Sequence, residues 1–186
     1  MLFEEPNLSD NEEVMSILDD ILVDVKSRNF SKRKNFTRED TLFRVSGEKL
    51  QEVMEGKPGG FSCVALKHEP HTDRLRELLI EEFEKNTDLS YKEAVLQGKT
   101  FYPKESFMSW HNDNSEPGYI LYCTYAEEDD KSFLRYRNTD TGNIETGWDK
   151  KGWHFRIFDI NADNPLWHCV FSDTIRFSIG YRFIRN

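Results

Sequence analysis

Cysteine is scarce in this chain of 186 residues, and its arrangement excludes two common uses of the residue. Cys63, Cys123 and Cys169 are odd in number, widely scattered and without the close pairing that zinc sites show. A disulfide framework of the kind that stabilises small secreted proteins needs paired cysteines and an oxidising compartment. We therefore predict reduced, partly buried thiols in an intracellular protein.

Long apolar runs are also missing. No segment approaches the roughly 20 consecutive apolar residues that a membrane-spanning helix needs. Residues 1–6 have neither the basic n-region nor the apolar h-region of a secretory signal. We expect a cytoplasmic protein without a membrane as a partner, and the sequence leaves its oligomeric state open.

Basic residues are fewer than acidic residues in this chain. The 25 Lys and Arg residues stand against 34 Asp and Glu residues, which gives a formal net charge of −9. Proteins that bind nucleic acid electrostatically draw much of their affinity from neutralised phosphates, so an acidic total argues against that class. Residues 26–34 form a local basic run, which we interpret as a solvated loop.

Helical patterns dominate the first 99 residues. Ser9 and Glu12 have the spacing of a capping box, and the apolar residues that follow predict a helix over residues 10–27. A clear amphipathic helix begins at Pro70. For the shorter segments, we expect helices over residues 47–55 and 91–97 and a strand over residues 61–67.

From Thr100 onward, aromatic and β-branched runs alternate with turn signals, which is typical of an all-β region. We expect strands near residues 101–103, 106–112, 118–125, 132–138, 144–148, 153–159, 166–171 and 175–184. Residues 140–143 and 149–152 have the composition of hairpin turns. The pattern predicts an α+β fold, with the N-terminal helices packed on one face of a β-sandwich or jelly roll. No linker separates the two regions, so we expect a single domain over residues 1–186.

Two His-x-Asp patterns occur, and local geometry separates them. His71 and Asp73 begin the predicted helix, where side chains two residues apart diverge. His111 and Asp113 end a strand-like run, where side chains two residues apart share a face and can converge on one metal ion. His168 lies in a later, otherwise apolar strand. Two neutral imidazoles and one carboxylate suit Fe(II) with open coordination positions. Taken alone, each piece also fits a surface polar patch or a core histidine.

The last predicted strand is polar on one face and apolar on the other. Arg176, Ser178, Gly180 and Arg182 share the polar face by strand parity. If that face points into a barrel, the two arginines bury charge that needs an anion, and a guanidinium fork suits a carboxylate. The alternative, that this face is simply exposed to solvent, leaves the glycine unexplained.

Together these residues resemble the Fe(II)/2-oxoglutarate-dependent oxygenases, whose core is a double-stranded β-helix. The family pattern is His-x-Asp, a distal His and then Arg-x-Ser or Arg-x-Thr. It is matched here by His111-x-Asp113, His168 and Arg176-x-Ser178. The resemblance implies a double-stranded β-helix over residues 100–186, supported by the helical region of residues 1–99.

Further spacing is similar to that of AlkB-like and prolyl-hydroxylase-like members of the family. Tyr102 precedes His111 by nine residues, and Arg182 follows Arg176 by six. Two departures from these branches are visible. Thr100 stands where AlkB-like repair enzymes usually carry Asn, and Arg176 stands where prolyl-hydroxylase-like enzymes often carry Lys.

The resemblance also implies roles for these residues and for three small reactants: Fe(II), 2-oxoglutarate and O₂. The residues that it assigns to Fe(II) are His111, Asp113 and His168. Those that it assigns to the C5 carboxylate of 2-oxoglutarate are Arg176, Ser178 and Tyr102. Arg182 either reaches the C1 carboxylate or is structural, and the substrate approaches beside Trp110 and Asn112.

The expected function is therefore that of a dioxygenase that hydroxylates a substrate and releases succinate and CO₂. A protein side chain is the first substrate class, as in the prolyl-hydroxylase-like branch. One alternative is an AlkB-like oxygenase or demethylase of nucleobases, with residues 26–34 as its electrostatic foothold. Another is a non-catalytic, cupin-like binding module. The sequence leaves the substrate open among protein or peptide, nucleic acid and metabolite.

Overall fold

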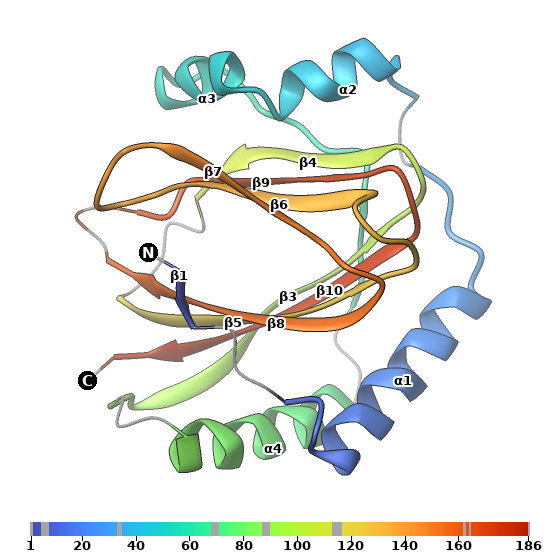
Figure 1. Ribbon diagram of the computed structural model, residues 1–186, viewed down its shortest axis with the longest axis vertical. Coiled ribbons are helices and arrows are strands. Elements are labelled where there is room, and N and C mark those ends of the chain that lie inside the picture. Colours follow the sequence, from blue (N-terminus) through green and yellow to red (C-terminus); the bar gives the residue numbers. More distant parts are fainter. Residues whose placement is uncertain are drawn as a thin grey trace.

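Two antiparallel β-sheets face each other, and helices lie on their outer sides (Figure 1). The structure is a computed structural model. It describes residues 2–4, 8–32, 35–67, 71–86, 90–112, 117–161, 163 and 165–185.

The connectivity of the sheets is that of a double-stranded β-helix. In spatial order, the larger sheet contains β1 (Leu2–Glu4), β8 (Gly152–Ile160), β5 (Gly118–Ala126), β10 (Arg176–Ile184), β3 (Glu93–Tyr102) and β2 (Val64–Ala65). The smaller sheet contains β4 (Ser106–His111), β9 (His168–Ser172), β6 (Ser132–Arg137) and β7 (Ile144–Trp148). From β3 to β10, successive strands alternate between the two sheets, except that β6 and β7 are neighbours in the smaller sheet and form a hairpin. This is the predicted jelly roll.

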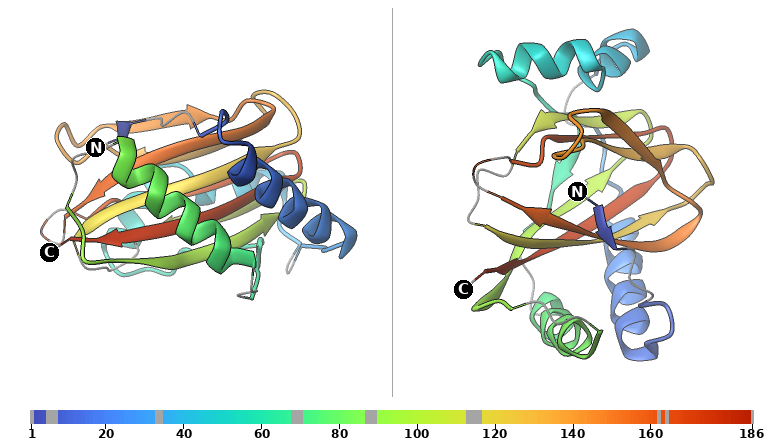
Figure 2. Two further views of the ribbon diagram at one scale, coloured as in Figure 1. Left: turned by 90° about the horizontal axis from the view of Figure 1, so that it is seen from below. Right: turned by 60° about the vertical axis from the view of Figure 1, so that its left-hand side comes forward.

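Helices cover both sheets, not one face as the sequence predicted. In Figures 1 and 2, α1 (Glu12–Ser27) and α4 (His71–Asn86) lie on the outer face of the larger sheet. On the opposite side, α2 (Arg38–Arg44) and α3 (Gly47–Met54) lie against the smaller sheet. The short helix α2 was not predicted. It begins after Thr37, whose side chain accepts a hydrogen bond from the Asp40 amide.

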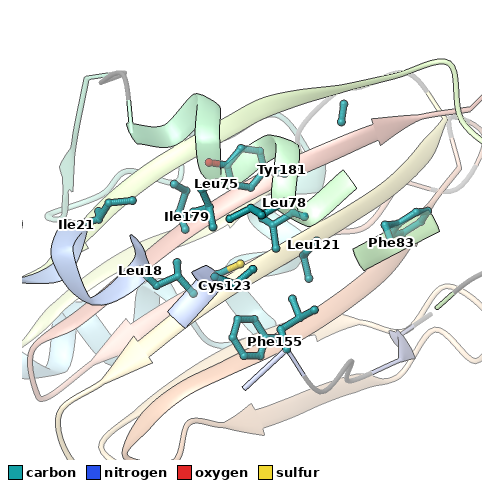
Figure 3. Close-up of a cluster of buried hydrophobic side chains, with 14 of the residues drawn as sticks. Leu18, Ile21, Leu75, Leu78, Phe83, Leu121, Cys123, Phe155, Ile179 and Tyr181 are labelled. Atoms are coloured by element: carbon teal, nitrogen blue, oxygen red, sulfur yellow. The ribbon is translucent and has the colours of Figure 1, made fainter. Parts of the chain in front are cut away.

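Strand alternation explains which side of β10 the helices cover. Ile179 and Tyr181 are fully buried against α1 and α4 (Figure 3). Phe177 is fully buried in the same cluster. On the helix side, Phe83 of α4 stacks on Phe183, with ring centroids 4.2 Å apart. The opposite face of β10, which carries Arg176, points between the two sheets. The solvent-exposed alternative for this polar face is therefore wrong.

Most predicted strands are present, but three local predictions are wrong. Residues 91–97 were expected to be helical, yet β3 begins at Glu93 because this segment pairs with β10 over its whole length. The core thus begins before residue 100. Asn11, not Ser9, caps α1 by accepting a hydrogen bond from the Val14 amide. Residues 149–152 join β7 to β8, which lie in different sheets, so they form no hairpin.

The three cysteines Cys63, Cys123 and Cys169 are buried and free of disulfides, in agreement with the predicted reduced thiols. Within the described part of the chain, no helix has both the length and the apolar character needed to cross a membrane.

The packing of α1 on the larger sheet can be tested with Leu18→Ala. Leu18 is fully buried, so truncation should lower the free energy of unfolding by about 2–5 kcal/mol through lost burial and a residual cavity. Urea unfolding measures this change. Val23→Ala, on the same helix but 69% exposed, is the matched control and should stay within about 0.5 kcal/mol of the parent. Equal losses in both variants would contradict this orientation of α1.

Candidate metal and anion site

A cavity of about 440 Å³ lies between the two sheets and receives side chains from both. The predicted site residues that line it are Tyr102, His111, His168 and Ser178. Its other walls include the apolar side chains of Met108, Leu134 and Val170. The sequence therefore identified residues that are far apart in the chain and meet in one cavity.

His111 and His168 lie opposite each other on the paired strands β4 and β9. Their ring centroids are 4.1 Å apart, and the register of β4 shifts between Met108 and His111, which is where a bulge re-aims a side chain. Each ring places Nδ1 beside a backbone carbonyl: His111 is 2.8 Å from the Ser109 oxygen and His168 is 3.2 Å from the Leu166 oxygen. If each Nδ1 donates its proton there, both Nε2 atoms keep a lone pair for a metal ion.

Asp113, the third predicted metal ligand, lies outside the described residues. The strand-parity argument that places it beside His111 therefore stays a prediction. Among the residues that the structure describes, no group of three or more His, Cys, Asp or Glu side chains is arranged to hold a metal ion. The described part of the candidate centre is the histidine pair.

Tyr122 is a cavity residue that the sequence did not reveal. Its hydroxyl lies 3.4 Å from Nε2 of His168. Its ring rests against Gly180 of the neighbouring strand, where an added Cβ would come within 3.0 Å of the Tyr122 Cε1 atom. This close approach explains the glycine on the polar face of β10. The sequence placed Tyr122 in a predicted strand, but its pairing with Gly180, which turns both toward the cavity, is visible only in the structure.

Arg176 lies at one end of β10, in a buried ionic cluster. The residue is 1% exposed, its guanidinium lies over the Tyr102 ring at 5.0 Å, and its Nε donates to Oδ2 of Asp149 at 2.8 Å. The Asp149 carboxylate is fully buried and is the acceptor that unites the cluster. Its other donors are Ser132 Oγ at 2.7 Å, His154 Nε2 at 2.8 Å and Arg156 Nη1 at 2.7 Å.

The charges of this cluster do not balance. Burial by itself raises the pKa of the Asp149 carboxyl. The attraction of Arg176, the hydrogen bond from His154 and the charge of Arg156 outweigh burial and hold that pKa well below its usual range. One carboxylate then stands against two guanidinium groups. In addition, the buried Nη1 of Arg176 has no hydrogen-bond partner among the described residues. Such a group fits an anionic ligand.

Hydroxyl groups lie beside this surplus positive charge. Ser178 follows Arg176 on the same face of β10, and its Oγ is 3.4 Å from the Oγ1 of Thr124 on β5. Tyr102 pairs directly with Arg176 across β3 and β10. Tyr102 and Ser178 line the cavity, and Arg176 packs on Tyr102 without being part of the lining. Two hydroxyl donors with a buried guanidinium beside them suit the far carboxylate of a dicarboxylic acid.

Arg176 is itself absent from the cavity lining, and three further predicted residues do not line the cavity either. Trp110 is 1% exposed and donates from Nε1 to the Ser46 carbonyl at 2.6 Å, so it is part of the core beneath α3. This burial leaves no surface for a substrate, so the predicted contact of Trp110 with the substrate is wrong. Asn112 follows β4 and is half-buried. Arg182 is buried on the inner face of β10. The predicted roles of Asn112 and Arg182 stay predictions.

Comparison with known proteins finds similarity in structure and not in sequence. No protein-family model matches the chain, and no curated protein matches its sequence. A prolyl-4-hydroxylase from Pseudomonas putida aligns over 93% of this chain and 99% of its own, with 15% identity and a TM-score of 0.46. An oxidoreductase of the 2OG-Fe(II) oxygenase family from Burkholderia pseudomallei aligns over 84% and 94%, with 12% identity and a TM-score of 0.47. A prolyl hydroxylase from Trichoplax adhaerens, in complex with a hypoxia inducible factor peptide fragment, aligns over 96% and 94%, with 11% identity and a TM-score of 0.48.

The ionic cluster predicts a specific dependence of stability on pH. Because the pKa of Asp149 is lower in the folded than in the unfolded state, its contribution is complete above the unfolded value of about 3.9 and is lost as the pH falls toward the folded value. At neutral pH, Asp149→Asn should cost about 3–5 kcal/mol, because it leaves buried guanidinium groups without their counter-charge. Urea unfolding of both proteins should give a difference that shrinks below about pH 4.

Asp159→Asn is the control for this prediction. Asp159 pairs with Arg185 through a side chain that is 40% exposed, so its loss should cost at most about 1 kcal/mol. A difference between the parent and Asp149→Asn that stays constant from pH 7 to about pH 3 would contradict the assigned ionisation of Asp149.

Proposed function

We propose that this chain is an Fe(II)- and 2-oxoglutarate-dependent dioxygenase that hydroxylates a substrate, with succinate and CO₂ as coproducts. One observation carries the proposal. A single cavity is lined by the paired histidines His111 and His168 and by Tyr102, and the buried Arg176 guanidinium packs on the Tyr102 ring with its Nη1 unpartnered among the described residues. A 2-oxo dicarboxylic acid has a chelating end and a carboxylate end, and it matches both.

At the metal end, His111 and His168 would hold the ion through Nε2, and Asp113 is the proposed third ligand. The Nδ1 contacts to Ser109 and Leu166 fix the ring orientations before any metal binds. Bound iron and 2-oxoglutarate would supply the oxidation of a substrate C–H bond by O₂. Tyr122, with its hydroxyl beside His168, would restrict how a ligand sits next to the ion.

At the carboxylate end, Arg176 would pair with the C5 carboxylate, with the Ser178 and Tyr102 hydroxyls as further donors. Between the two ends, Met108, Leu134 and Val170 form apolar walls. These walls would exclude water from the reacting groups, which strengthens every charge interaction inside the cavity. Arg182 is the proposed partner of the C1 carboxylate.

The substrate that we favour is a protein side chain rather than a nucleobase. The described cations of the basic run already have acidic partners within the chain, which weakens it as a foothold for phosphates. These pairs are Lys26 with Glu127 at 2.9 Å, Arg28 with Asp24 at 2.5 Å, and Lys32 with Glu105 at 3.0 Å. The non-catalytic alternative, a cupin-like module, would bind the same ligand without turnover, and the succinate-release measurement below separates it from an oxygenase.

Anaerobic titration with Fe(II) and 2-oxoglutarate tests the proposed site directly. Chelation of the metal by the 2-oxo acid should give a weak visible metal-to-ligand charge-transfer band. His168→Ala should abolish the band because it removes a ligand. His71→Ala, at the start of α4, is the matched control and should retain it. Absence of the band in the parent protein would contradict the proposed function.

Succinate release tests the substrate class. The parent protein should form succinate in the presence of Fe(II), 2-oxoglutarate and O₂, faster when a peptide pool is added than when a nucleic-acid or metabolite pool is added. Removal of the metal with a chelator should abolish the signal, and added Fe(II) should restore it. Stimulation by single-stranded nucleic acid alone would favour the nucleobase alternative.

A further inference from the structure

Asp149 forms the centre of the buried ionic cluster, and its two oxygens have different partners. Oδ2 accepts from Arg176 Nε and Ser132 Oγ, at 2.8 and 2.7 Å. Oδ1 accepts from His154 Nε2 and Arg156 Nη1, at 2.8 and 2.7 Å. An ionised carboxylate offers about four acceptor sites, so these donors fill it. Asp149 therefore has no capacity to accept from the remaining nitrogens of Arg176.

A carboxylate in this position can have one of two roles, and the two roles predict opposite effects of its removal on the affinity for an anionic ligand. A competitor would occupy the forked end of the guanidinium and would have to leave before a ligand could bind. A positioning group would hold the guanidinium elsewhere and leave the fork available. The contact here is to Nε, while the buried Nη1 has no partner among the described residues. The geometry matches the positioning role.

Tyr102 and the backbone complete the restraint on Arg176. The guanidinium lies over the Tyr102 ring at 5.0 Å, which restricts its tilt, and β10 is paired on both sides by β3 and β5. An arginine side chain normally loses much rotamer freedom when it binds a ligand. Here the ion pair to Asp149 has already removed that freedom, so less affinity is lost to ordering on binding.

Positive charge near the cavity also bears on the choice of ligand. Arg176, whose Nη1 has no partner among the described residues, packs on Tyr102, and Tyr102 lines the cavity together with Ser178 and Lys99. A carboxylate on the ligand is attracted by this positive charge, whereas a methyl group in its place gains nothing from it.

We propose that Asp149 is a positioning residue that presents Arg176 to the far carboxylate of the cosubstrate and thereby selects a dicarboxylic over a monocarboxylic 2-oxo acid. This inference rests on the proposed function. Asp149 touches neither the metal nor the reacting atoms, and it acts through Arg176 alone.

The test is a binding measurement, independent of turnover. Isothermal titration under anaerobic conditions gives the dissociation constants of the Fe(II)-loaded protein for 2-oxoglutarate and for 2-oxopentanoate, which has a methyl group in place of the far carboxylate. Asp149→Asn should weaken 2-oxoglutarate binding roughly tenfold to hundredfold, the range expected for hydrogen bonds to charged groups. Binding of 2-oxopentanoate should change by less than about twofold, since that ligand does not use Arg176.

Three comparisons make the result specific. Asp159→Asn, an exposed acid on the outer side of β8, should leave both dissociation constants unchanged. In an Arg176→Gln background, Asp149→Asn should add no further loss for 2-oxoglutarate, because the two residues act as a unit. Ser132→Ala removes only one donor to Oδ2, preserves all charges, and should weaken 2-oxoglutarate several-fold.

The outcomes separate this inference from the proposed function. If the parent protein binds no 2-oxoglutarate, the proposed function is wrong. If it does bind, and Asp149→Asn binds 2-oxoglutarate equally or more tightly, or loses both ligands to the same extent, the positioning role is wrong. Should Asp149→Asn fail to fold, Ser132→Ala decides: a selective loss of 2-oxoglutarate supports the role, and unchanged binding overturns it.

Discussion

Strand β10 is the element on which both the core and the candidate site depend. It pairs along its full length with β3 on one side and β5 on the other, so its alternation is fixed at every residue. Phe177, Ile179 and Tyr181 face the helices and form the centre of the core. A shift of one residue would exchange this apolar face with the one that carries Arg176. The packing energy of the core therefore also fixes the direction of the charged side chains.

The two parts of the candidate site depend on different kinds of structure. The histidine pair is fixed by the pairing of β4 with β9 and by short contacts from each Nδ1 to the backbone. Arg176 is fixed by an ion pair with a carboxylate from the connection between β7 and β8, which crosses from one sheet to the other. Asp149 thereby joins β6, β8 and β10 through Ser132, Arg156 and Arg176. Backbone pairing forms one end of the site, and buried charge forms the other.

Features that depend on neighbouring residues in the chain could be predicted from the sequence, and features that depend on distant residues could not. Parity within one strand was enough to place Arg176 and Ser178 on a single face, and β10 has nearly the bounds expected for residues 175–184. The helix expected over residues 91–97 is wrong because pairing with β10, far along the chain, decides its structure. The role of Asp149 in the ionic cluster could not be predicted from the sequence, because its partners come from three separate strands. The error on Trp110 could have been avoided from the sequence. Trp110 directly precedes His111, and neighbouring residues on a strand point to opposite sides, so both cannot face the cavity.

The burial of the cysteines has a consequence for chemical durability. Burial raises the pKa of the Cys123 thiol, and for Cys169 it does so despite the opposing charge of Arg135. Both side chains thus stay protonated at physiological pH, and the thiolate, not the thiol, begins the oxidation sequence that leads to sulfenic and higher acids. The thiols of Cys123 and Cys169 are therefore held in the form that reacts most slowly with oxidants.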